Sequence, residues 1–388
     1  MSGSALFRIA HNIPSPYRLH LFRSLGLELG KRGLDLHVDF YARGHTDRPE
    51  AWQNPDILFS HAFWTDFRIP FGRSAGHLNP GLIAALARSD CDYLMVGGIW
   101  DTPTSALLSL SARAKCRIGW LEGNTRTPGV VTGPLGVAKR ALMARYDWLA
   151  VPGSEGRSYA GLVGGPAAAK KAVILPNLVD ERRFKPQPEE YGHRREMRQR
   201  LGLSEPTNLA LLPARLEPVK GIPQFLALLD PEILAGWVVL IVGEGSQQAE
   251  IERLIASRQL GDHVRLRPYV PYDDMPALYR AADLFVLPSA YDPNPLSVIE
   301  AMHSGLPLLL SMQCGNFPEA LQEGLNGWGF DPFKPAGVME ATRAAFSADI
   351  SELRAMGLAS TNRAQQYWTS TAAVSAFCDA LGIGQDLP

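Results

Sequence analysis

Residues 288–307 read PSAYDPNPLSVIEAMHSGLP, and they directly follow the apolar segment 283–287. That segment predicts a β-strand, so the quoted stretch begins at the carboxyl end of a strand, where open α/β sheets bind their ligands. Apolar residues then recur at helical spacing, which predicts a helix over about 297–304 whose N-terminal N–H groups face the ligand. A strand, a loop and a helix in this order indicate a ligand-binding βα unit.

Two acids in this stretch, Asp292 in the loop and Glu300 on the predicted helix, lie eight residues apart. Ionised carboxylates only accept hydrogen bonds and sugar hydroxyls donate them, so the pair suits a polyhydroxylated ligand. Taken singly, Asp292 before Pro293 is typical of a turn, and Glu300 is typical of a solvated helix residue. Their common place at one ligand edge favours the binding interpretation.

The length of 388 residues predicts two domains, each large enough to bury its own core. A formal net charge of −1 argues against a general nucleic-acid binder. No apolar run reaches the roughly 18 residues of a spanning helix, and the first residues lack the pattern of a secretion signal. We therefore expect a cytoplasmic protein, whose four scattered cysteines without a C-x-x-C pair are reduced thiols.

Apolar runs that alternate with helical patterns in both halves of the chain predict parallel, doubly wound sheets. In the first half the predicted strands are 6–10, 34–41, 93–96, 117–121, 148–151 and 172–175. In the second half they are 208–212, 237–242, 264–266, 283–287 and 308–311. The predicted fold class is α/β, with two Rossmann-like domains that face a central cleft.

The segment 182–206 is charged and contains prolines, which is typical of a crossing between domains. We expect an N-terminal acceptor-side domain over 1–184 and a C-terminal donor domain over 185–361. A last helical segment, 362–388, is expected to pack back on the N-terminal domain. Residues 42–74 are rich in aromatics and prolines without a clear period, so we expect irregular structure there.

Two further motifs follow predicted strands of the second half. Arg215 and Lys220 come from one turn after its first strand, and together they offer the planar fork and the point charge that suit a diphosphate. Gly243 and Gly245 open a helix after the next strand, where glycine lets the backbone approach a ligand. Surface cations and a plain βα turn are the simpler alternatives for the two motifs. The third glycine of the dinucleotide fingerprint is absent.

These motifs closely resemble those of the retaining glycosyltransferases of family 4, which have the GT-B fold. The resemblance covers nearly the whole second half, through PARLEPVKG, IVGEGSQQAEI, DPNPLSVIEAMHSGLPLLLS and EGLNGWGF. It is looser in the first half, where IPSPYRLHLF and LPNLVD carry it.

The resemblance implies a role for each matching position. A catalytic set binds the diphosphate (Arg215, Lys220), the donor sugar (Asp292) and the ribose hydroxyls (Glu300). The donor-binding residues are those of the glycine turn, those beside the base and those of the sugar loop: Gly243, Gly245, Val270, Met275, Asn294, Pro295, Leu296 and Ser297. The resemblance also implies retention at the anomeric carbon and no cofactor other than the nucleotide sugar itself.

The chain departs from the family pattern at three places. Asp292 stands where the family usually has Glu, residues 13–16 replace a Gly-Gly loop, and Glu122 stands where a histidine is common. An acceptor-binding role for Glu122 and a role in capping the turn that follows it both remain open. The acceptor-side candidates are Asn12, Tyr17, Arg18 and Glu122.

A literal D-x-D occurs at Asp90 and Asp92, the pattern with which metal-dependent sugar transferases bind a divalent cation. Here both acids precede the predicted strand 93–96, which puts them at the edge of the sheet away from the ligand. We therefore expect a turn at this position and metal-independent transfer.

We expect a retaining glycosyltransferase that moves a sugar from a UDP- or GDP-sugar to a hydroxyl of a saccharide or lipid-linked saccharide, as in polysaccharide biosynthesis. A nucleotide-sugar epimerase and a catalytically inactive nucleotide-sugar-binding module are the alternatives. Basic residues Lys139, Arg140 and Arg145 lie among apolar ones, which allows peripheral contact with an anionic membrane at its inner face. A solvated helix face is the simpler explanation.

Overall fold

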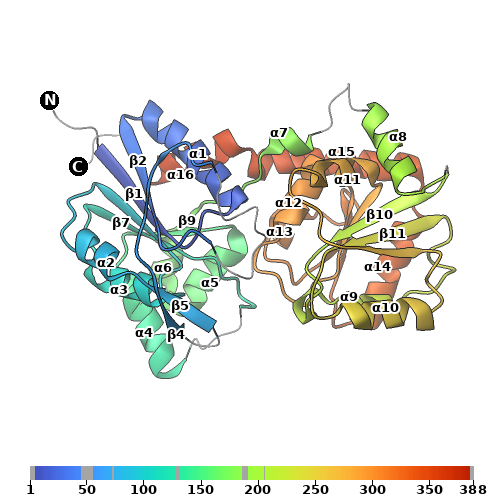
Figure 1. Cartoon of the computed structure of the whole chain (residues 1–388), viewed down its shortest axis with the longest axis horizontal. Helices are drawn as coiled ribbons and strands as arrows, with labels where there is room; N and C mark the ends of the chain where they lie inside the picture. Colours follow the sequence, from blue (N-terminus) through green and yellow to red (C-terminus); the bar gives the residue numbers. More distant parts are fainter. Residues whose placement is uncertain are drawn as a thin grey trace. The chain divides into compact units, whose positions relative to one another are not determined.

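The computed structural model describes residues 5–44, 56–71, 74–127, 132–185, 191–204 and 206–384. The chain forms two compact units, one of residues 1–178 with 370–388 and one of residues 179–369 (Figure 1). These boundaries differ from the expected ones at 184/185 and 361/362. The short helix α7 (Glu181–Phe184) packs on helices of the second unit, and helix α15 (Ile350–Trp368) continues to Trp368 before the chain returns.

The first unit contains a parallel sheet in the order β3-β2-β1-β6-β7-β8-β9. Its strands are β1 (Ala5–His11), β2 (Leu34–Phe40), β3 (Ser60–Phe63), β6 (Tyr93–Gly97), β7 (Cys116–Trp120), β8 (Trp148–Val151) and β9 (Ala172–Ile174). The six strands predicted for this half are present. The chain runs outward from β1 in both directions, so β1 and β6 flank the point where the strand order reverses, which is where doubly wound sheets bind ligands.

The expectation of irregular structure over 42–74 is wrong for the part of that segment that the structure describes. It contains β3 and an antiparallel hairpin of β4 (Phe67–Phe71) and β5 (Ser74–Leu78), while residues 45–55 and 72–73 lie outside the described residues. Asn79 ties the region together because its amide donates to the carbonyls of Tyr41 (2.9 Å) and Thr65 (3.0 Å). Strands of four and five residues are too short to show a clear alternation in sequence.

The helices of the first unit are α1 (Pro16–Lys31), α2 (Pro80–Leu86), α3 (Pro103–Ser111), α4 (Gly133–Ala144), α5 (Ser154–Gly164), α6 (Pro166–Lys170) and α16 (Ser370–Ala380). The last of these packs against α1, although it is far away in sequence. Arg32 joins the two helices through an ion pair with Asp379 at 2.7 Å and a bond to the carbonyl of Ile383 at 3.0 Å. The last helical segment is interrupted at Thr369, so only its second part belongs to the first unit.

The second unit contains a parallel sheet in the order β12-β11-β10-β13-β14-β15. Its strands are β10 (Asn208–Pro213), β11 (Trp237–Val242), β12 (Val264–Arg267), β13 (Leu284–Leu287), β14 (Leu308–Ser311) and β15 (Gly327–Phe330). By position in the unit this is the order 3-2-1-4-5-6 of nucleotide-binding doubly wound sheets, with the reversal between β10 and β13. Strand β15 was not predicted, because two glycines in four residues hide its pattern.

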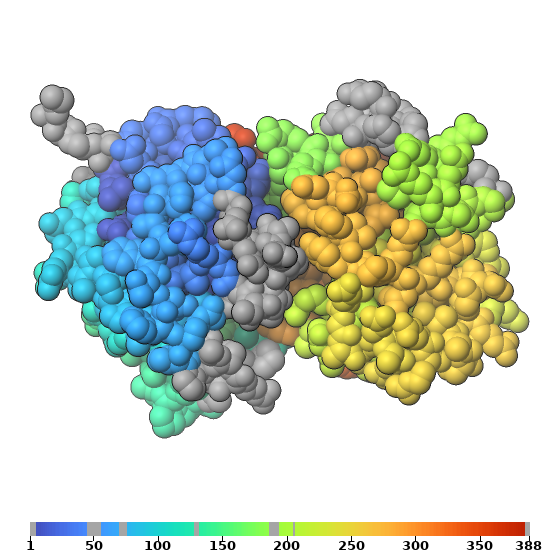
Figure 2. Space-filling view, viewed as in Figure 1, coloured from blue at the N-terminus to red at the C-terminus, as the bar shows by residue number. Residues whose placement is uncertain are grey.

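The other helices of the second unit are α8 (Tyr191–Arg200), the 3₁₀ turn η3 (Pro218–Lys220), α9 (Ile222–Leu226), α10 (Gln248–Ser257), α11 (Met275–Ala281), α12 (Leu296–His303), α13 (Phe317–Ala320) and α14 (Pro335–Ser347). Helix α8, light green in Figure 2, lies on the outer surface of this unit. The strands β10, β11, β13 and β14 are buried along most of their length, so they form a rigid base for the loops at their carboxyl ends. Among the described residues, no helix is both long and apolar enough to span a membrane.

Candidate functional site

The loops that follow β10 and β13 meet at the reversal point of the second sheet. The amide of Tyr291 donates to the carbonyl of Val219 at 3.0 Å, which fixes one loop to the other. Gly221 has a φ of +65°, and a Cβ there would lie 2.5 Å from the carbonyl oxygen of Pro288. Glycine is therefore required at this position by both its conformation and the close approach of the two loops.

Lys220 and Asp292 form an ion pair at this junction. Their side chains are 15% and 9% exposed, so the pair is largely covered. The backbone of Asp292 is also held, because its N–H donates to Gln313 (3.3 Å) and its carbonyl accepts from Gly315 (2.9 Å) in the loop after β14. Two of the four predicted catalytic residues are thus brought into contact from positions far apart in sequence.

Arg215 lies on the same loop as Lys220 and is exposed. Its neighbour Glu217 accepts hydrogen bonds from the side chain (2.7 Å) and the amide (3.2 Å) of Ser246, and these bonds, together with the nearby charge of Arg215, lower the pKa of Glu217. The loop after β10 is thereby fixed to the loop after β11, while the guanidinium of Arg215 remains on the surface.

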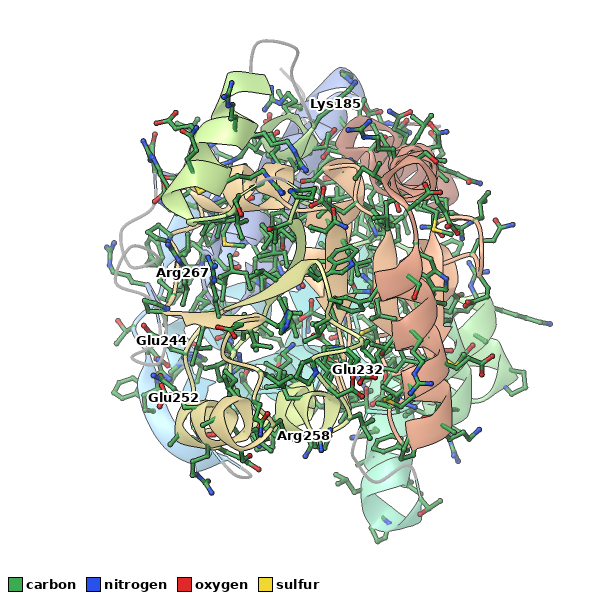
Figure 3. All side chains as sticks on the ribbon, turned by 90° about the vertical axis from the view of Figure 1, so that its right-hand side faces the viewer. Lys185, Glu232, Glu244, Glu252, Arg258 and Arg267 are labelled. Atoms are coloured by element: carbon green, nitrogen blue, oxygen red, sulfur yellow. The ribbon has the colours of Figure 1, made fainter. Side chains whose placement is uncertain are left out.

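The close packing of two loops explains the glycine turn. A Cβ at Gly243 or Gly245 would collide with the backbone of Ala214 or Leu216, because the loops after β10 and β11 run side by side. The amide of Leu216 donates to the carbonyl of Glu244 at 2.9 Å, and the side chain of Glu244 in turn accepts from the amide of Tyr269 at 3.3 Å. Figure 3 shows Glu244 near Arg267, the last residue of β12.

Glu300 is 8% exposed on α12, so the solvated-helix interpretation of this acid is wrong. Its carboxyl accepts a hydrogen bond of 2.6 Å from the hydroxyl of Tyr279 on α11. Burial raises the pKa of Glu300 to about 7, although the bond from Tyr279 acts in the opposite direction. A buried carboxyl group whose pKa lies this close to neutral pH is typical of a binding or catalytic position.

The donor-loop residues Asn294, Leu296 and Ser297 are half-buried at the start of α12. Pro295 caps the helix, and its carbonyl accepts from the side-chain amide of Asn316 at 3.0 Å. The two residues proposed beside the base, Val270 and Met275, are also half-buried, in the segment between β12 and α11. All the donor-side candidates therefore lie on loops or helix starts that follow β10, β11, β12 and β13.

In the first unit, Arg18 and Glu122 form an ion pair at the carboxyl edge of the sheet. Arg18 also donates to the side-chain oxygen of Asn177 at 2.9 Å and lies over the ring of Trp120 at 4.2 Å. Tyr17 contacts the guanidinium at 5.0 Å, and Asn12 directly follows β1. The four acceptor-side candidates thus lie at the carboxyl edge of the first sheet. Two of them, Tyr17 and Glu122, contact the guanidinium of the third, Arg18.

A model of the family "Glycosyl transferases group 1" matches residues 193–359, which hold the whole second sheet and its site. Over these residues the second unit is similar to this glycosyltransferase family. Two curated relatives are a D-inositol 3-phosphate glycosyltransferase of Streptomyces avermitilis, 29% identical over 71% of this chain and 59% of that protein, and a mannosylfructose-phosphate synthase of Agrobacterium fabrum, 35% identical over 42% and 37%. The chain spans about half the length of the curated relatives it matches.

Solved glycosyltransferase structures match nearly the whole chain. HepE of Anabaena in complex with UDP has a TM-score of 0.72 at 17% identity, covering 97% of this chain and 99% of that one. A glycosyltransferase of Rickettsia africae has a TM-score of 0.72 at 13% identity, with coverage of 98% and 99%. This likeness confirms the predicted GT-B fold of two Rossmann-like domains.

In the D-x-D of the first unit, Asp92 serves as a structural anchor. Asp92 accepts from the amide of Leu6 at 2.8 Å and from Lys115 at 2.7 Å, and the bond to Lys115 is the main cause of its lowered pKa. Leu6 lies at the start of β1 and Lys115 directly precedes β7, the strands on either side of β6, so both partners are away from the carboxyl edge. The expectation of a structural role here agrees with these contacts.

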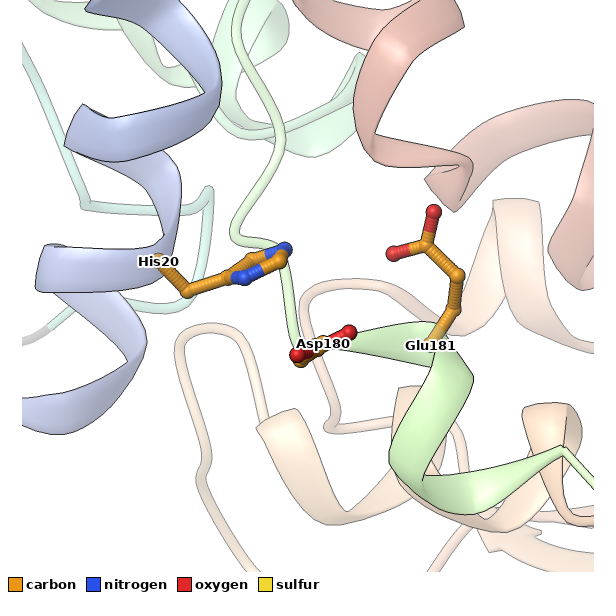
Figure 4. Close-up of side chains that lie close together, drawn as sticks. All are labelled: His20, Asp180 and Glu181. Carbon is orange, nitrogen blue, oxygen red and sulfur yellow. The ribbon is translucent and has the colours of Figure 1, made fainter.

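Helix α7, at the start of the second unit, is held by charged side chains. Asp180 caps the helix by accepting from the amide of Arg182 at 3.3 Å, and Glu181 is its first residue (Figure 4). Arg183 pairs with Asp273 at 2.6 Å, and its carbonyl accepts from Arg280 of α11 at 3.0 Å. This anchoring explains why the second unit begins before the predicted boundary.

The basic residues of α4 and its C-cap Arg145 make contacts within the first unit. Arg140 donates to the carbonyl of Val163 at 3.3 Å, Arg145 to those of Ser109 and Leu110, and Lys139 lies 5.1 Å from the ring centre of Trp100. These contacts explain the basic residues without a membrane.

Sequence reasoning missed several residues of the site, namely Tyr279, Asn316, Asn177 and Trp120. Tyr279 lies one helical turn after Met275, so its face of α11 could have been inferred from i, i+4 spacing once Met275 was chosen. Asn316 follows β14, a strand whose loop carried no recognised motif. Trp120 ends β7 and Asn177 follows β9, so their place at the carboxyl end of a strand was the signal that could have identified them.

Proposed function

We propose that the chain is a retaining glycosyltransferase which moves a sugar from a nucleoside diphosphate sugar to a hydroxyl of a saccharide or lipid-linked saccharide. The observation that carries this proposal is the largely covered Lys220–Asp292 pair at the reversal point of a nucleotide-binding sheet, close in sequence to the buried Glu300. Relatives whose printed names are glycosyltransferases, and a similar structure in complex with UDP-glucose, support a UDP-sugar over a GDP-sugar.

The diphosphate of the donor binds Lys220 and Arg215 in this proposal. Lys220 is held by Asp292 in the unliganded protein and exchanges this carboxylate for a phosphate when the donor enters. Asp292 then accepts hydrogen bonds from the hydroxyls of the donor sugar. This exchange links the two binding events, because a covered carboxylate that has lost its ion-pair partner is costly until the sugar reaches it.

Glu300 accepts hydrogen bonds from the ribose hydroxyls, which requires its ionised form. Its pKa of about 7 means that a substantial fraction is protonated at neutral pH before the nucleotide binds. Hydrogen bonds to the carboxylate favour the charged form, so nucleotide binding releases a proton from this site. Val270, between β12 and α11, and Met275, the first residue of α11, contact the base.

Charge develops on the leaving diphosphate as the glycosidic bond breaks. We assign its stabilisation to Lys220, Arg215 and the N–H groups at the start of α12, and this supports transfer without a metal or another cofactor. The acceptor hydroxyl attacks from the face on which the diphosphate leaves, and a phosphate oxygen takes its proton. Retention of configuration follows from attack on that face.

Calorimetric titration with UDP and GDP, followed by incubation with the matching sugar nucleotides and a panel of saccharides in excess chelator, tests the proposal. We expect binding of one nucleotide, chelator-resistant transfer, and an unchanged anomeric configuration in the proton NMR spectrum of the product. Conversion of the donor alone to an epimer would support the epimerase instead. Nucleotide binding without any turnover would support the inactive module.

A further inference from the structure

The guanidinium of Arg18 is a charged group fixed inside the first unit. Its side chain is 2% exposed, lies over the rings of Trp120 (4.2 Å) and Tyr17 (5.0 Å), and donates to Asn177 at 2.9 Å. Burial lowers the pKa of Arg18. Such a charge is tolerated only when a partner of opposite charge is placed beside it, and Glu122 is that partner.

Glu122 differs from Arg18 in that 42% of its side chain is exposed. The turn that follows is closed by other groups, because Thr127 accepts from the amide of Asn124 at 2.7 Å, and Asn124 accepts from the amide of Arg126 at 2.9 Å. These contacts close the turn without Glu122. A partly exposed carboxylate paired with a buried arginine therefore lies at the carboxyl edge of β7.

Several buried polar atoms beside this pair lack a hydrogen-bond partner among the described residues. They are Nδ1 of His11, Oδ1 of Asn12, Nε of Arg18 and Nε1 of Trp120. The ring of His11 stacks on Trp120 at 5.3 Å, so three of the four side chains form one cluster. Native proteins bury few such atoms, and a group of them at the ligand edge of a doubly wound sheet indicates a site that a ligand or its water completes.

We propose that Glu122 accepts a hydrogen bond from a hydroxyl of the acceptor, and that Arg18 is the positioning residue which holds its carboxylate. This inference rests on the proposed transferase function and adds the acceptor chemistry to it. A phosphate or carboxylate of the acceptor at this place would meet the negative charge of Glu122, whereas the charge of Arg18 is already matched. The acceptor group bound here is therefore a neutral polyol.

The test uses methyl glycosides of glucose, galactose, mannose and N-acetylglucosamine, and their 6-phosphates, as acceptors with the sugar nucleotide that the wild type binds. The wild type should prefer neutral glycosides.

Glu122→Gln should raise the acceptor KM at least tenfold, while the melting temperature and the affinity for the nucleoside diphosphate are unchanged. The matched control is Glu155→Gln, which removes a carboxylate bound to Thr125 and Arg126 in the same unit and should keep the acceptor KM.

The role of Arg18 is tested by a double-mutant cycle with Arg18→Lys, which keeps the charge but loses the planar guanidinium. If Arg18 acts through Glu122, Arg18→Lys should raise the acceptor KM in the wild type and have no further effect on it in Glu122→Gln. A purely structural arginine would instead lower the melting temperature and the activity equally in both backgrounds, and that result would overturn the positioning role.

Two failures are distinguishable. A wild type that binds no nucleoside diphosphate contradicts the proposed function itself. A wild type that binds the nucleotide and transfers sugar, but whose Glu122→Gln variant keeps its acceptor KM, contradicts only the inference. Preference for the phosphorylated glycosides, or transfer to none of the neutral ones by a nucleotide-binding protein, also overturns the acceptor class.

Discussion

The two units each hold an ion pair at the carboxyl edge of their sheet, and the pairs differ in which partners are exposed. In the second unit Lys220 and Asp292 are both largely covered, at 15% and 9% exposure. In the first unit Arg18 is buried and Glu122 is 42% exposed. The covered pair of Lys220 and Asp292 can exchange partners, which suits a ligand that carries both an anionic group and hydroxyls. The buried Arg18 with the partly exposed Glu122 suits a ligand whose hydroxyl donates a hydrogen bond.

The largest effect is expected for Lys220→Met. It removes the positive charge for the diphosphate and takes the ion-pair partner Lys220 away from the covered Asp292, which should lower the free energy of unfolding by about 3 kcal/mol and abolish nucleotide binding. Urea unfolding and calorimetric titration measure the two effects. In the double variant Lys220→Met/Asp292→Asn, most of the stability should return while binding stays lost. A stable Lys220→Met protein would break the comparison, because the pair would then not be covered in solution.

A second effect is expected from the pH dependence of Glu300. Its folded pKa of about 7 lies above the ordinary 4.5, so the folded state binds more protons and stability falls as pH rises from 4.5 to 7. Glu300→Gln, which keeps an oxygen for Tyr279, should be more stable than the wild type at pH 8, by up to about 3 kcal/mol, and equally stable near pH 4. Thermal or urea unfolding across this range tests the sign.

The same group should make nucleotide binding depend on pH. Because the ionised form accepts the ribose hydroxyls, wild-type affinity for the nucleoside diphosphate should fall by up to about tenfold per pH unit below 7. The Glu300→Gln variant should bind more weakly and without this pH dependence. Equal pH profiles for the two proteins would remove Glu300 from the ribose site.

From the sequence, the helices and strands could be predicted better than the packing of these elements against one another. Long apolar runs separated by helical patterns gave eleven strands in two parallel sheets, but β15 and the hairpin of β4 and β5 are too short or too rich in glycine to show a period. The domain boundaries were displaced because 182–206 was interpreted as the crossing and 362–388 as one last helical segment, whereas α7 and the whole of α15 belong to the second unit. Local patterns decide what an element is, and contacts decide where it belongs.

The candidate site shows the same limit. The pairing of Lys220 with Asp292 depends on β10 and β13 being neighbours, and alternation of strands and helices does not specify strand order. Arg18, in the first turn of a helix, looks like a surface residue in sequence, and its burial requires the ring of Trp120 from β7. Candidate site residues could thus be predicted from their residue type and their place at a strand end. Which of them are buried, and which pair with one another, could not be predicted.

The smallest effect is expected at Asp92, an acid at the opposite edge of the first sheet from Glu122. Asp92→Asn weakens the hydrogen bond from Leu6 and the bond from Lys115, so the free energy of unfolding should fall by about 1 kcal/mol at pH 7. The pKa of Asp92 is lowered, so its contribution is present above the unfolded value of 3.8 and is lost as pH falls further. Wild type and variant should therefore converge in stability at low pH.

Transfer by Asp92→Asn should equal that of the wild type, with and without chelator, because the acid lies away from the carboxyl edge where the proposed site is. This result would sharpen the contrast with Glu122, whose loss of charge is expected to alter acceptor binding and not stability. A variant that is well folded but inactive, with activity restored by added divalent cation, would show that the D-x-D takes part in the reaction. In that case the D-x-D motif would predict the role of Asp92 better than the place of Asp92 on the sheet does.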